Sequence, residues 1–337
     1  MSHTATMTES SGNSRQPEYA VEAHGLTKKY GGNLALQGVS FAVQRGTVFG
    51  VIGPNGAGKT TTMRTLLDII RPTSGHAMVL GVDSRNAGPE LRRRIGFLPG
   101  ELILEGRISG RRLLQHYADI SGPVAKGRIE ELAERLNLDL KRPVRKLSKG
   151  NKQKLGIIQA FMHQPDLLVL DEPTSGLDPL MQQEFLNLVK EARDGGQSVF
   201  LSSHVISEIQ QAADEVAILR DGKIVRIAGV EELRNSAIRH LRIVCTGVTA
   251  SELQERLAAV SGLGSLEFKT SDDPAAVEAT ATLEGEIQPF VQAASTLELK
   301  DLVIEEPDLE ESVLKLYTAP DQPAPGEPAP RQEKHHD

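Results

Sequence analysis

A glycine-rich segment that follows an apolar run restricts the fold of this chain more than any other part of its sequence. The segment reads Gly53-Pro-Asn-Gly-Ala-Gly-Lys59-Thr60 and satisfies the pattern G-x-x-x-x-G-K-[ST]. Glycines in such a loop allow backbone N–H groups to wrap closely around phosphate oxygens, and the helix expected after the loop directs its positive end toward the same oxygens. The sequence therefore predicts a strand, a loop and a helix that bind phosphate groups.

Two side chains complete the predicted phosphate site. Lys59 is expected to reach the β- and γ-phosphates as a point charge, and the Thr60 hydroxyl is expected to be a ligand of Mg²⁺. A glycine-rich turn without a ligand is the alternative, and the bare pattern arises by chance in on the order of one per cent of chains of this length. The predicted nucleotide-binding residues of the segment are Gly53, Pro54, Asn55, Gly56, Ala57, Gly58, Lys59, Thr60 and Thr61.

A second apolar run ends in two adjacent acids. Leu167-Leu-Val-Leu170 has the pattern of a buried strand, and Asp171 and Glu172 follow it directly. Charges are costly to bury without partners, and a metal ion supplies one. Asp171 is therefore expected to hold Mg²⁺, and Glu172 to polarise an attacking water as the general base. Two acids that are merely solvated at the strand end are the alternative, which the phosphate loop upstream disfavours.

Composition and charge narrow the class of protein. The chain has 337 residues, enough for one large domain and a smaller one, and a formal net charge of -7. That charge, the absence of tryptophan and the lack of a Lys/Arg-rich stripe argue against nucleic acid as a partner. Cys245 is the only cysteine, so no intrachain disulfide is expected. The first twenty residues lack the apolar core of a signal peptide and no run of about 18 apolar residues follows, so we expect a chain that does not cross a bilayer by itself.

The order of the predicted elements is that of an α/β fold with a helical insertion. Short strands come first, helices dominate between Ser109 and His163, and strands alternate with helices from Leu167 onward. This alternation predicts parallel strands joined by crossover helices. The resulting prediction assigns a disordered tail to residues 1–18, a nucleotide-binding domain to 19–236 with a helical subdomain at about 101–163, an accessory domain to 237–318, and a disordered Pro-rich tail to 319–337.

The accessory domain has a pattern of its own. From His240 the sequence predicts elements in the order β-α-β-β-α-β, which is the split ferredoxin-like arrangement. Thr249 as the N-cap of a helix and the regular alternation of Val277–Leu283 support this order. A further short helix is expected at Asp308–Tyr317. Patterned strands without convergent polar groups indicate regulation or dimer contact rather than catalysis.

Together these motifs resemble those of the ATP-binding cassette (ABC) proteins, and the resemblance spans roughly residues 21–235. Two further segments stand where that family has its signature and its D-loop. The resemblance implies that the signature contacts the γ-phosphate of ATP held by a second copy or a related cassette, and that the D-loop couples the two sites. Taken alone, both segments are typical of helix caps. The matching residues are Ser148, Lys149, Gly150 and Asn151 in the signature, with Lys149 and Asn151 in place of the usual glycine and glutamine, and Ser175, Gly176, Leu177 and Asp178 in the D-loop.

The resemblance also assigns two isolated residues. His204, in Leu201-Ser-Ser-His204, matches the histidine that bonds the γ-phosphate and orients the water with Glu172. A lone histidine after a strand is otherwise more often structural. Tyr30, in Lys28-Lys-Tyr30-Gly-Gly, matches the aromatic residue that stacks on adenine. The predicted catalytic set is therefore Glu172, His204 and Lys59.

The chain departs from the family at one functional position. After the strand at Ile95–Leu98, where ABC proteins carry a glutamine that ligates Mg²⁺ and senses the transmembrane partner, the chain has Gly100 followed by Glu101. Either Glu101 takes over the metal contact, or the loop serves chiefly to dock the partner and water completes the metal shell. The predicted metal ligands are Thr60, Asp171 and, under the first alternative, Glu101.

The resemblance implies a P-loop NTPase fold and an ATPase that uses ATP and Mg²⁺ to drive transport. The signature form Ser148-Lys-Gly-Asn-Lys152 and the appended domain are similar to those of cassettes that serve separate permeases for drugs, antibiotics or lipid-like substrates. The implied partners are such a permease and a second cassette, at the cytoplasmic face of the cell membrane. A soluble ABC ATPase with a regulatory or non-transport role is the alternative, and the presence of Glu172 disfavours a module without turnover.

Overall fold

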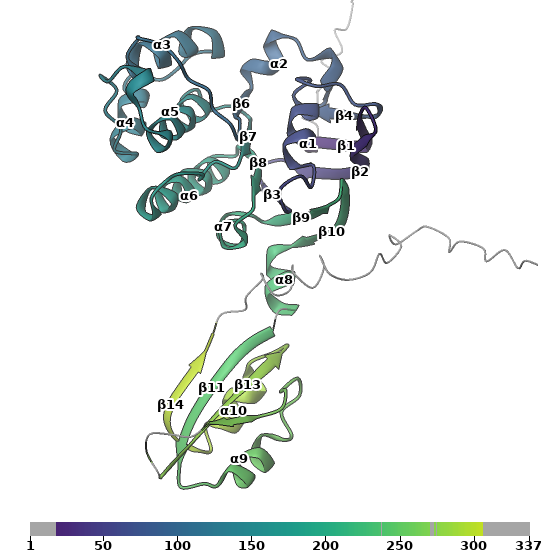
Figure 1. Cartoon of the computed structure of the whole chain (residues 1–337), viewed down its shortest axis with the longest axis vertical. Coiled ribbons are helices and arrows are strands. Elements are labelled where there is room, and N and C mark those ends of the chain that lie inside the picture. The colour runs from purple at the N-terminus through teal and green to yellow at the C-terminus, as the bar shows by residue number, and fades with distance from the viewer. Residues whose placement is uncertain (1–17, 237, 270–272, 274, 306–337) are drawn as a thin grey trace, which may run out of the picture.

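The computed structural model describes residues 18–236, 238–269, 273 and 275–305 (Figure 1). Except for Glu18, the predicted tails lie outside these residues, as does the predicted helix at Asp308–Tyr317. Of the described helices, none is long and apolar enough to span a membrane. Three sheets organise this part of the chain.

A six-stranded sheet forms the centre of the larger part of the molecule. Its strand order is β10-β9-β3-β8-β7-β6, and all neighbours pair in parallel except β9 and β10, which form an antiparallel hairpin. The carboxyl ends of the parallel strands therefore lie along one edge, which is where open α/β sheets bind ligands. The strands are β3 (Val48–Ile52), β6 (Ile95–Leu98), β7 (Leu167–Asp171), β8 (Ser198–Ser203), β9 (Glu215–Arg220) and β10 (Lys223–Gly229).

An antiparallel sheet and a helix cover one face of this central sheet. The strand order is β2-β1-β4-β5, and its apolar side chains share a hydrophobic core with the helix α1 (Lys59–Leu66). Phe41 from this layer stacks on Phe49 and Phe200 of the central sheet, with ring centroids 5.5 and 5.4 Å away. The strands are β1 (Tyr19–Tyr30), β2 (Asn33–Gln44), β4 (Ser74–Val79) and β5 (Val82–Asp83).

Sequence patterns did not predict the elements between α1 and β6. These are β4, β5, the 3-10 turn η1 (Ser84–Asn86) and the helix α2 (Pro89–Arg93). Each is too short to show a hydrophobic period, and β4 is specified by its antiparallel pairing with β1 rather than by its own composition.

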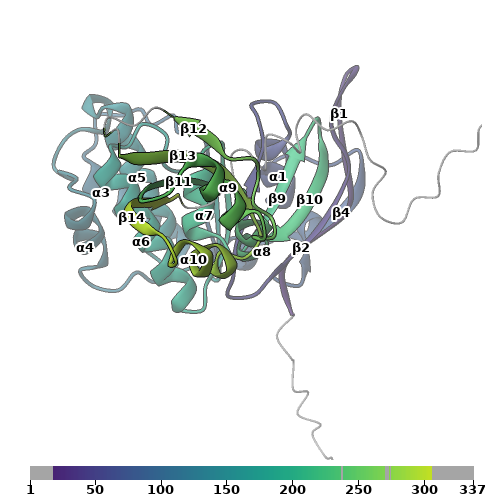
Figure 2. The same cartoon turned by 90° about the horizontal axis from the view of Figure 1, so that it is seen from below.

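A helical layer covers the opposite face, as Figures 1 and 2 show. Its side chains form a second core with the other face of the central strands. Polar caps start three of the helices, because the side-chain oxygens of Ser109, Ser148 and Asp178 accept backbone N–H bonds of 3.4, 3.3 and 3.1 Å. The elements are α3 (Gly110–Ser121), α4 (Arg128–Arg135), η2 (Val144–Lys146), α5 (Lys149–Phe161), α6 (Pro179–Asp194) and α7 (Ile206–Ala212).

An arginine joins the helical insertion to α6. Arg135, at the end of α4, donates to Glu184 at 2.6 Å and to both carboxylate oxygens of Glu191 at 2.6 Å. Hydrogen bonds from this guanidinium hold the pKa of Glu191 below its ordinary value. The bidentate geometry fixes the orientation of α4 against α6.

Replacing Arg135 with methionine should lower the free energy of unfolding by about 1–2 kcal/mol at neutral pH, after allowance for the exposure of Glu191. The lowered pKa of Glu191 means that the ion pair stabilises the fold above the pKa of the unfolded chain and is lost as the pH falls through the folded pKa. The melting temperatures of the wild type and the variant should therefore differ at pH 7 and converge as the pH falls through the lowered pKa of Glu191. A difference that persists unchanged at acidic pH would show that packing of the side chain, and not the ion pair, stabilises this contact.

The last described elements form a third, separate sheet. They follow α8 (Val230–Ser236) in the order β-α-β-β-α-β that the sequence predicts, with strand order β12-β13-β11-β14 and every pair antiparallel. The helices α9 and α10 pack on one face of this sheet and share a core with it (Figure 2). The elements are β11 (Ile238–Thr246), α9 (Ala250–Leu257), β12 (Glu267–Lys269), β13 (Ala276–Glu284), α10 (Gln288–Ala294) and β14 (Glu298–Ile304).

Candidate functional site

The glycine-rich loop lies between β3 and α1, at the carboxyl edge of the central sheet, as predicted. Gly53 has no room for a side chain, because an added Cβ would lie 2.4 Å from the carbonyl oxygen of Leu219. At Gly58 the backbone has φ of 110° and a Cβ would approach the Ala35 oxygen to 2.8 Å. The strands β2 and β9 therefore enclose the loop and require glycine on both sides of it.

Lys59 is almost completely buried in the first turn of α1, with 6% of its surface exposed. Its Nζ donates to the carbonyl oxygen of Gly53 at 2.5 Å and lies 3.2 Å from Oε1 of Glu172. The ammonium group thus lies between the glycine-rich loop and the end of β7. Thr60 and Thr61 follow it and are half-buried.

Asp171 and Glu172 occupy different environments at the end of β7. Asp171 is 2% exposed, and its Oδ1 accepts a bond of 2.6 Å from the hydroxyl of Ser202 on β8. Glu172 adopts a left-handed backbone conformation, with φ of 47°, which is uncommon for a residue with a side chain. This conformation turns the chain out of the strand and places the second acid beside Lys59.

His204 completes this arrangement from the end of β8. Its Nδ1 lies 2.5 Å from Oε2 of Glu172, and its backbone N–H donates to the same oxygen at 3.4 Å. The carboxylate of Glu172 is therefore held between Lys59 and His204. The structure brings together the three residues that the sequence predicted as catalytic, although they lie in three separate segments of the chain.

The signature and D-loop segments contact each other within one chain, which the sequence did not predict. Lys149 donates to the hydroxyl of Ser175 at 3.3 Å. An added Cβ at Gly150 would lie 2.5 Å from the carbonyl oxygen of Gly176, so glycine is required there for close packing. The adjacent Ser148 is exposed.

Two predicted site residues lie apart from the group formed by Lys59, Glu172 and His204. Tyr30 stands at the end of β1 with 48% of its surface exposed, and Nζ of Lys28 lies 5.0 Å from its ring centroid. Glu101 is exposed and lines a cavity of about 530 Å³ with Lys149 and Gln153 of α5.

The structure places Gly100 beside Asp171, one of the predicted metal ligands. Gly100, rather than Glu101, faces Asp171, because an added Cβ at Gly100 would lie 3.1 Å from Oδ2 of that acid. Within the described ranges, no group of three or more His, Cys, Asp and Glu side chains is placed to hold a metal ion. A metal contact through Glu101 therefore stays a prediction.

Sequence reasoning missed two residues that support the site. Ser202 bonds Asp171 through its hydroxyl, and the same oxygen accepts the backbone N–H of Glu172 at 3.1 Å. Gln153 on α5 is 3% exposed and donates to the carbonyl oxygens of Glu172 and Pro173. The serines that directly follow the apolar run of β8 were a usable signal for Ser202. Gln153 gave no such signal, because α5 contains several other polar residues.

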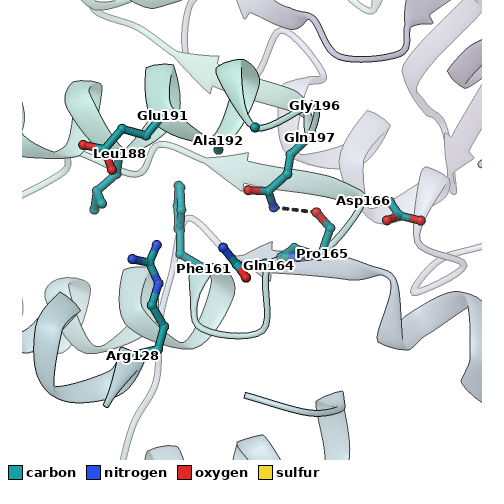
Figure 3. A pocket seen from close by; sticks show the side chains of 11 residues that line it. Arg128, Phe161, Gln164, Pro165, Asp166, Leu188, Glu191, Ala192, Gly196 and Gln197 are labelled. Atoms are coloured by element: carbon teal, nitrogen blue, oxygen red, sulfur yellow. Dashed lines mark hydrogen bonds between the residues drawn. The ribbon is translucent and has the colours of Figure 1, made fainter. Parts of the chain in front are cut away.

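A separate cavity of about 440 Å³ lies at the other end of β7. Figure 3 shows the side chains that line it. Arg128, Phe161 and Glu191 contribute to its lining, and Gln197 donates to the carbonyl oxygen of Pro165 at 2.5 Å. Pro165 precedes β7 and Asp171 ends it, so the cavity is separated from the predicted catalytic residues by the length of that strand.

The fold, with the glycine-rich loop and the two acids at the carboxyl edge of the central sheet, places this protein in the class of P-loop nucleotide-binding cassettes. The family model described as ABC transporter matches residues 36–175. An uncharacterised ABC transporter ATP-binding protein, YcbN of Bacillus subtilis, is 36% identical over 68% of this chain and 76% of its own length. The bacitracin transport ATP-binding protein BcrA of Bacillus licheniformis is 38% identical over 64% of this chain and 72% of its own length. The chain therefore belongs to the ATP-binding proteins of ABC transporters, a family of ATPases.

Solved structures agree with this assignment. A structure of an ATP binding subunit of an ABC transporter has a TM-score of 0.59 and 28% identity, and it matches 64% of this chain and 92% of the other. A dimeric, post-hydrolysis ATP-binding cassette bound to ADP and Pi has a TM-score of 0.57 over 62% of this chain and 98% of the other. At 22% identity the second likeness shows the fold alone.

Proposed function

We propose that this chain is the ATP-hydrolysing subunit of an exporter that moves a drug, an antibiotic or a lipid-like substrate through a separate membrane permease. The substrate class is supported by relatives named for bacitracin transport and for daunorubicin resistance, the latter DrrA3 of Streptomyces coeruleorubidus at 35% identity. The proposed location is the cytoplasmic face of the cell membrane, with the permease and a second cassette as partners. The observation that carries the ATPase part is the carboxylate of Glu172 held between Lys59 and His204.

In the proposed mechanism each of these groups has a separate task. Lys59 exchanges its bond to the carbonyl oxygen of Gly53 for the β- and γ-phosphate oxygens when ATP enters the loop. Glu172 accepts the proton of the attacking water, and His204 orients that water and bonds the γ-phosphate.

Mg²⁺ fits the oxygen ligands at the end of β7. Asp171 is a buried carboxylate whose partner of 2.6 Å is a neutral hydroxyl, so a cation would offset its burial. We infer that Asp171 and Thr60 hold the ion, with Glu101 or water completing its shell. When bound, the ion neutralises charge on the β- and γ-phosphate oxygens.

Two copies of the chain would enclose two ATP molecules. Ser148 is exposed and Gly150 is half-buried at the N-terminal end of α5, which is the end of the helix that would face a γ-phosphate on a partner subunit. We assign residues 19–236 to the nucleotide-binding domain and 237–318 to the accessory domain, which is supported by the separate hydrophobic core of β11–β14.

The proposed function is tested with the purified full-length chain. ATP hydrolysis should require Mg²⁺, and the chain should co-purify in detergent with a membrane-spanning protein encoded beside it. Recovery with ribosomes or DNA at physiological salt would contradict the transporter assignment, and failure to bind Mg·ATP in the presence of the permease would contradict the ATPase assignment.

A prediction with a smaller expected effect concerns the contact between Tyr30 and the adenine ring of ATP. Replacing it with alanine should weaken ATP binding about 10-fold, since stacking of a base on an aromatic ring contributes about 1–3 kcal/mol. Replacement with phenylalanine keeps the ring and should leave binding within about 2-fold. Equilibrium binding of a fluorescent ATP analogue measures both, and equal losses for the two variants would show that the hydroxyl, not the ring, makes the contact.

A further inference from the structure

The signature helix α5 holds the peptide groups that follow the proposed base. Gln153, one turn into this helix, is 3% exposed, and its Nε2 donates to the carbonyl oxygen of Pro173 at 2.9 Å and to that of Glu172 at 3.3 Å. Lys149, four residues earlier on the same face of the helix, bonds Ser175. The first turns of α5 therefore form hydrogen bonds with the segment 172–175 through two side chains.

The segment 172–175 contains Glu172, the residue of the site with a strained backbone conformation. The left-handed conformation of Glu172, with φ of 47°, persists only where neighbouring groups hold it. Its N–H donates to the carbonyl oxygen of Ser202 at 3.2 Å and lies 3.1 Å from the hydroxyl of the same residue. Its carbonyl oxygen accepts from the N–H of Ser175 at 3.2 Å and from Gln153. Of these partners, Gln153 alone comes from the helical insertion.

We propose that Gln153 is a positioning residue that holds the Glu172 peptide in its catalytic conformation and links the signature helix to the base of its own subunit. The inference rests on the proposed function and deepens it. Glutamine suits this task because its terminal NH₂ has two donors, which match the two carbonyl oxygens. A side chain of similar length without those donors would remove this donor from the Pro173 carbonyl oxygen and leave the Glu172 carbonyl oxygen with the N–H of Ser175 alone, which loosens the peptide.

The link has a consequence for a pair of ATP sites. In the proposed dimer Ser148 and Gly150, at the start of α5, face the γ-phosphate on the partner subunit. A shift of α5 on binding or loss of that phosphate moves Gln153 as well, because all three residues lie within the first two turns of one helix. The state of one ATP site is thereby transmitted to the base of the other.

The first test compares two glutamines that make similar bonds. Gln153→Met removes the donors near Glu172, and Gln197→Met removes a bond to a proline carbonyl oxygen at the opposite end of β7 (Figure 3). With the full chain and its permease, Gln153→Met should lower kcat for ATP about 10- to 100-fold and change KM by less than about 3-fold. Gln197→Met should keep kcat within about 2-fold of the wild type, whatever its effect on thermal unfolding.

A second variant gives a readout that a purely structural role would not produce. Gln153→Glu has the shape of glutamine, but its carboxyl group donates a hydrogen bond only when it is protonated. The ratio of its kcat to that of the wild type should therefore rise as the pH falls from about 8 to about 6, because burial raises the pKa of a carboxyl group. The same ratio for Gln153→Met should not change with pH.

The outcomes separate this inference from the proposed function. A wild-type kcat in Gln153→Met, or equal losses in Gln153→Met and Gln197→Met, would overturn the positioning role while leaving the ATPase assignment intact. Should Gln153→Met not fold, a Gln153→Glu ratio that is independent of pH overturns it. A wild-type chain that binds no ATP overturns the proposed function and this inference together.

Discussion

Replacing Glu172 with glutamine should reduce kcat for ATP hydrolysis by about 10²–10⁴-fold while ATP still binds. A glutamine amide has the shape of the carboxylate but cannot accept the proton of the attacking water. The variant also removes the ion pair of 3.2 Å between Lys59 and Glu172, so the ammonium group becomes more available to phosphate oxygens. We therefore expect ATP to hold two copies of the variant together in a stable dimer. Phosphate release and size-exclusion chromatography with and without ATP measure the two effects.

A matched control for this experiment is Glu90→Gln. Glu90 is an exposed carboxylate on α2 and pairs with Arg93 at 3.1 Å, so its loss should change kcat by less than about 2-fold. Turnover of Glu172→Gln at the wild-type rate would reject Glu172 as the base. Loss of turnover without ATP-dependent dimers would indicate that the variant fails to bind ATP. This result would also contradict the role of Glu172 as the base.

The second large effect is expected on binding. Lys59→Met should weaken ATP affinity by about 10²–10⁴-fold, because two charge-assisted bonds to phosphate oxygens contribute about 1.5–3 kcal/mol each. The methionine stem fills the space of the buried lysine, so the loss reports on the charge more than on packing. Isothermal calorimetry with Mg·ATP, or displacement of a fluorescent analogue, gives the dissociation constant.

Lys141→Met serves as the control because Lys141 is exposed in the segment between α4 and α5. Its affinity for ATP should equal that of the wild type. Tight binding by Lys59→Met would refute the assigned phosphate contact, and thermal unfolding of both variants shows whether either change has disturbed the fold.

Much of the candidate site could be predicted because its parts are short contiguous patterns. The loop from Gly53 to Thr60 and the acids Asp171 and Glu172 each follow an apolar strand, and both lie at the carboxyl edge of the sheet as expected. The tertiary structure was needed to see that Gly100 lies beside Asp171 and that Glu101 lines a cavity with residues of α5. Neighbouring residues in a loop point in different directions, and which one faces the site depends on the path of the backbone.

The sequence by itself determined the phosphate-binding loop, the acidic strand end, the signature helix and the alternation that makes the central sheet parallel. These features depend on turn chemistry and hydrophobic period, which act over a few residues. Only the tertiary structure decided that Glu172 lies between Lys59 and His204, that Ser202 and Gln153 hold its strained backbone, and that α5 contacts the D-loop of its own chain. Such contacts join residues distant in sequence, and they depend on the order of strands in the sheet and the packing of helices on it, which no local pattern encodes.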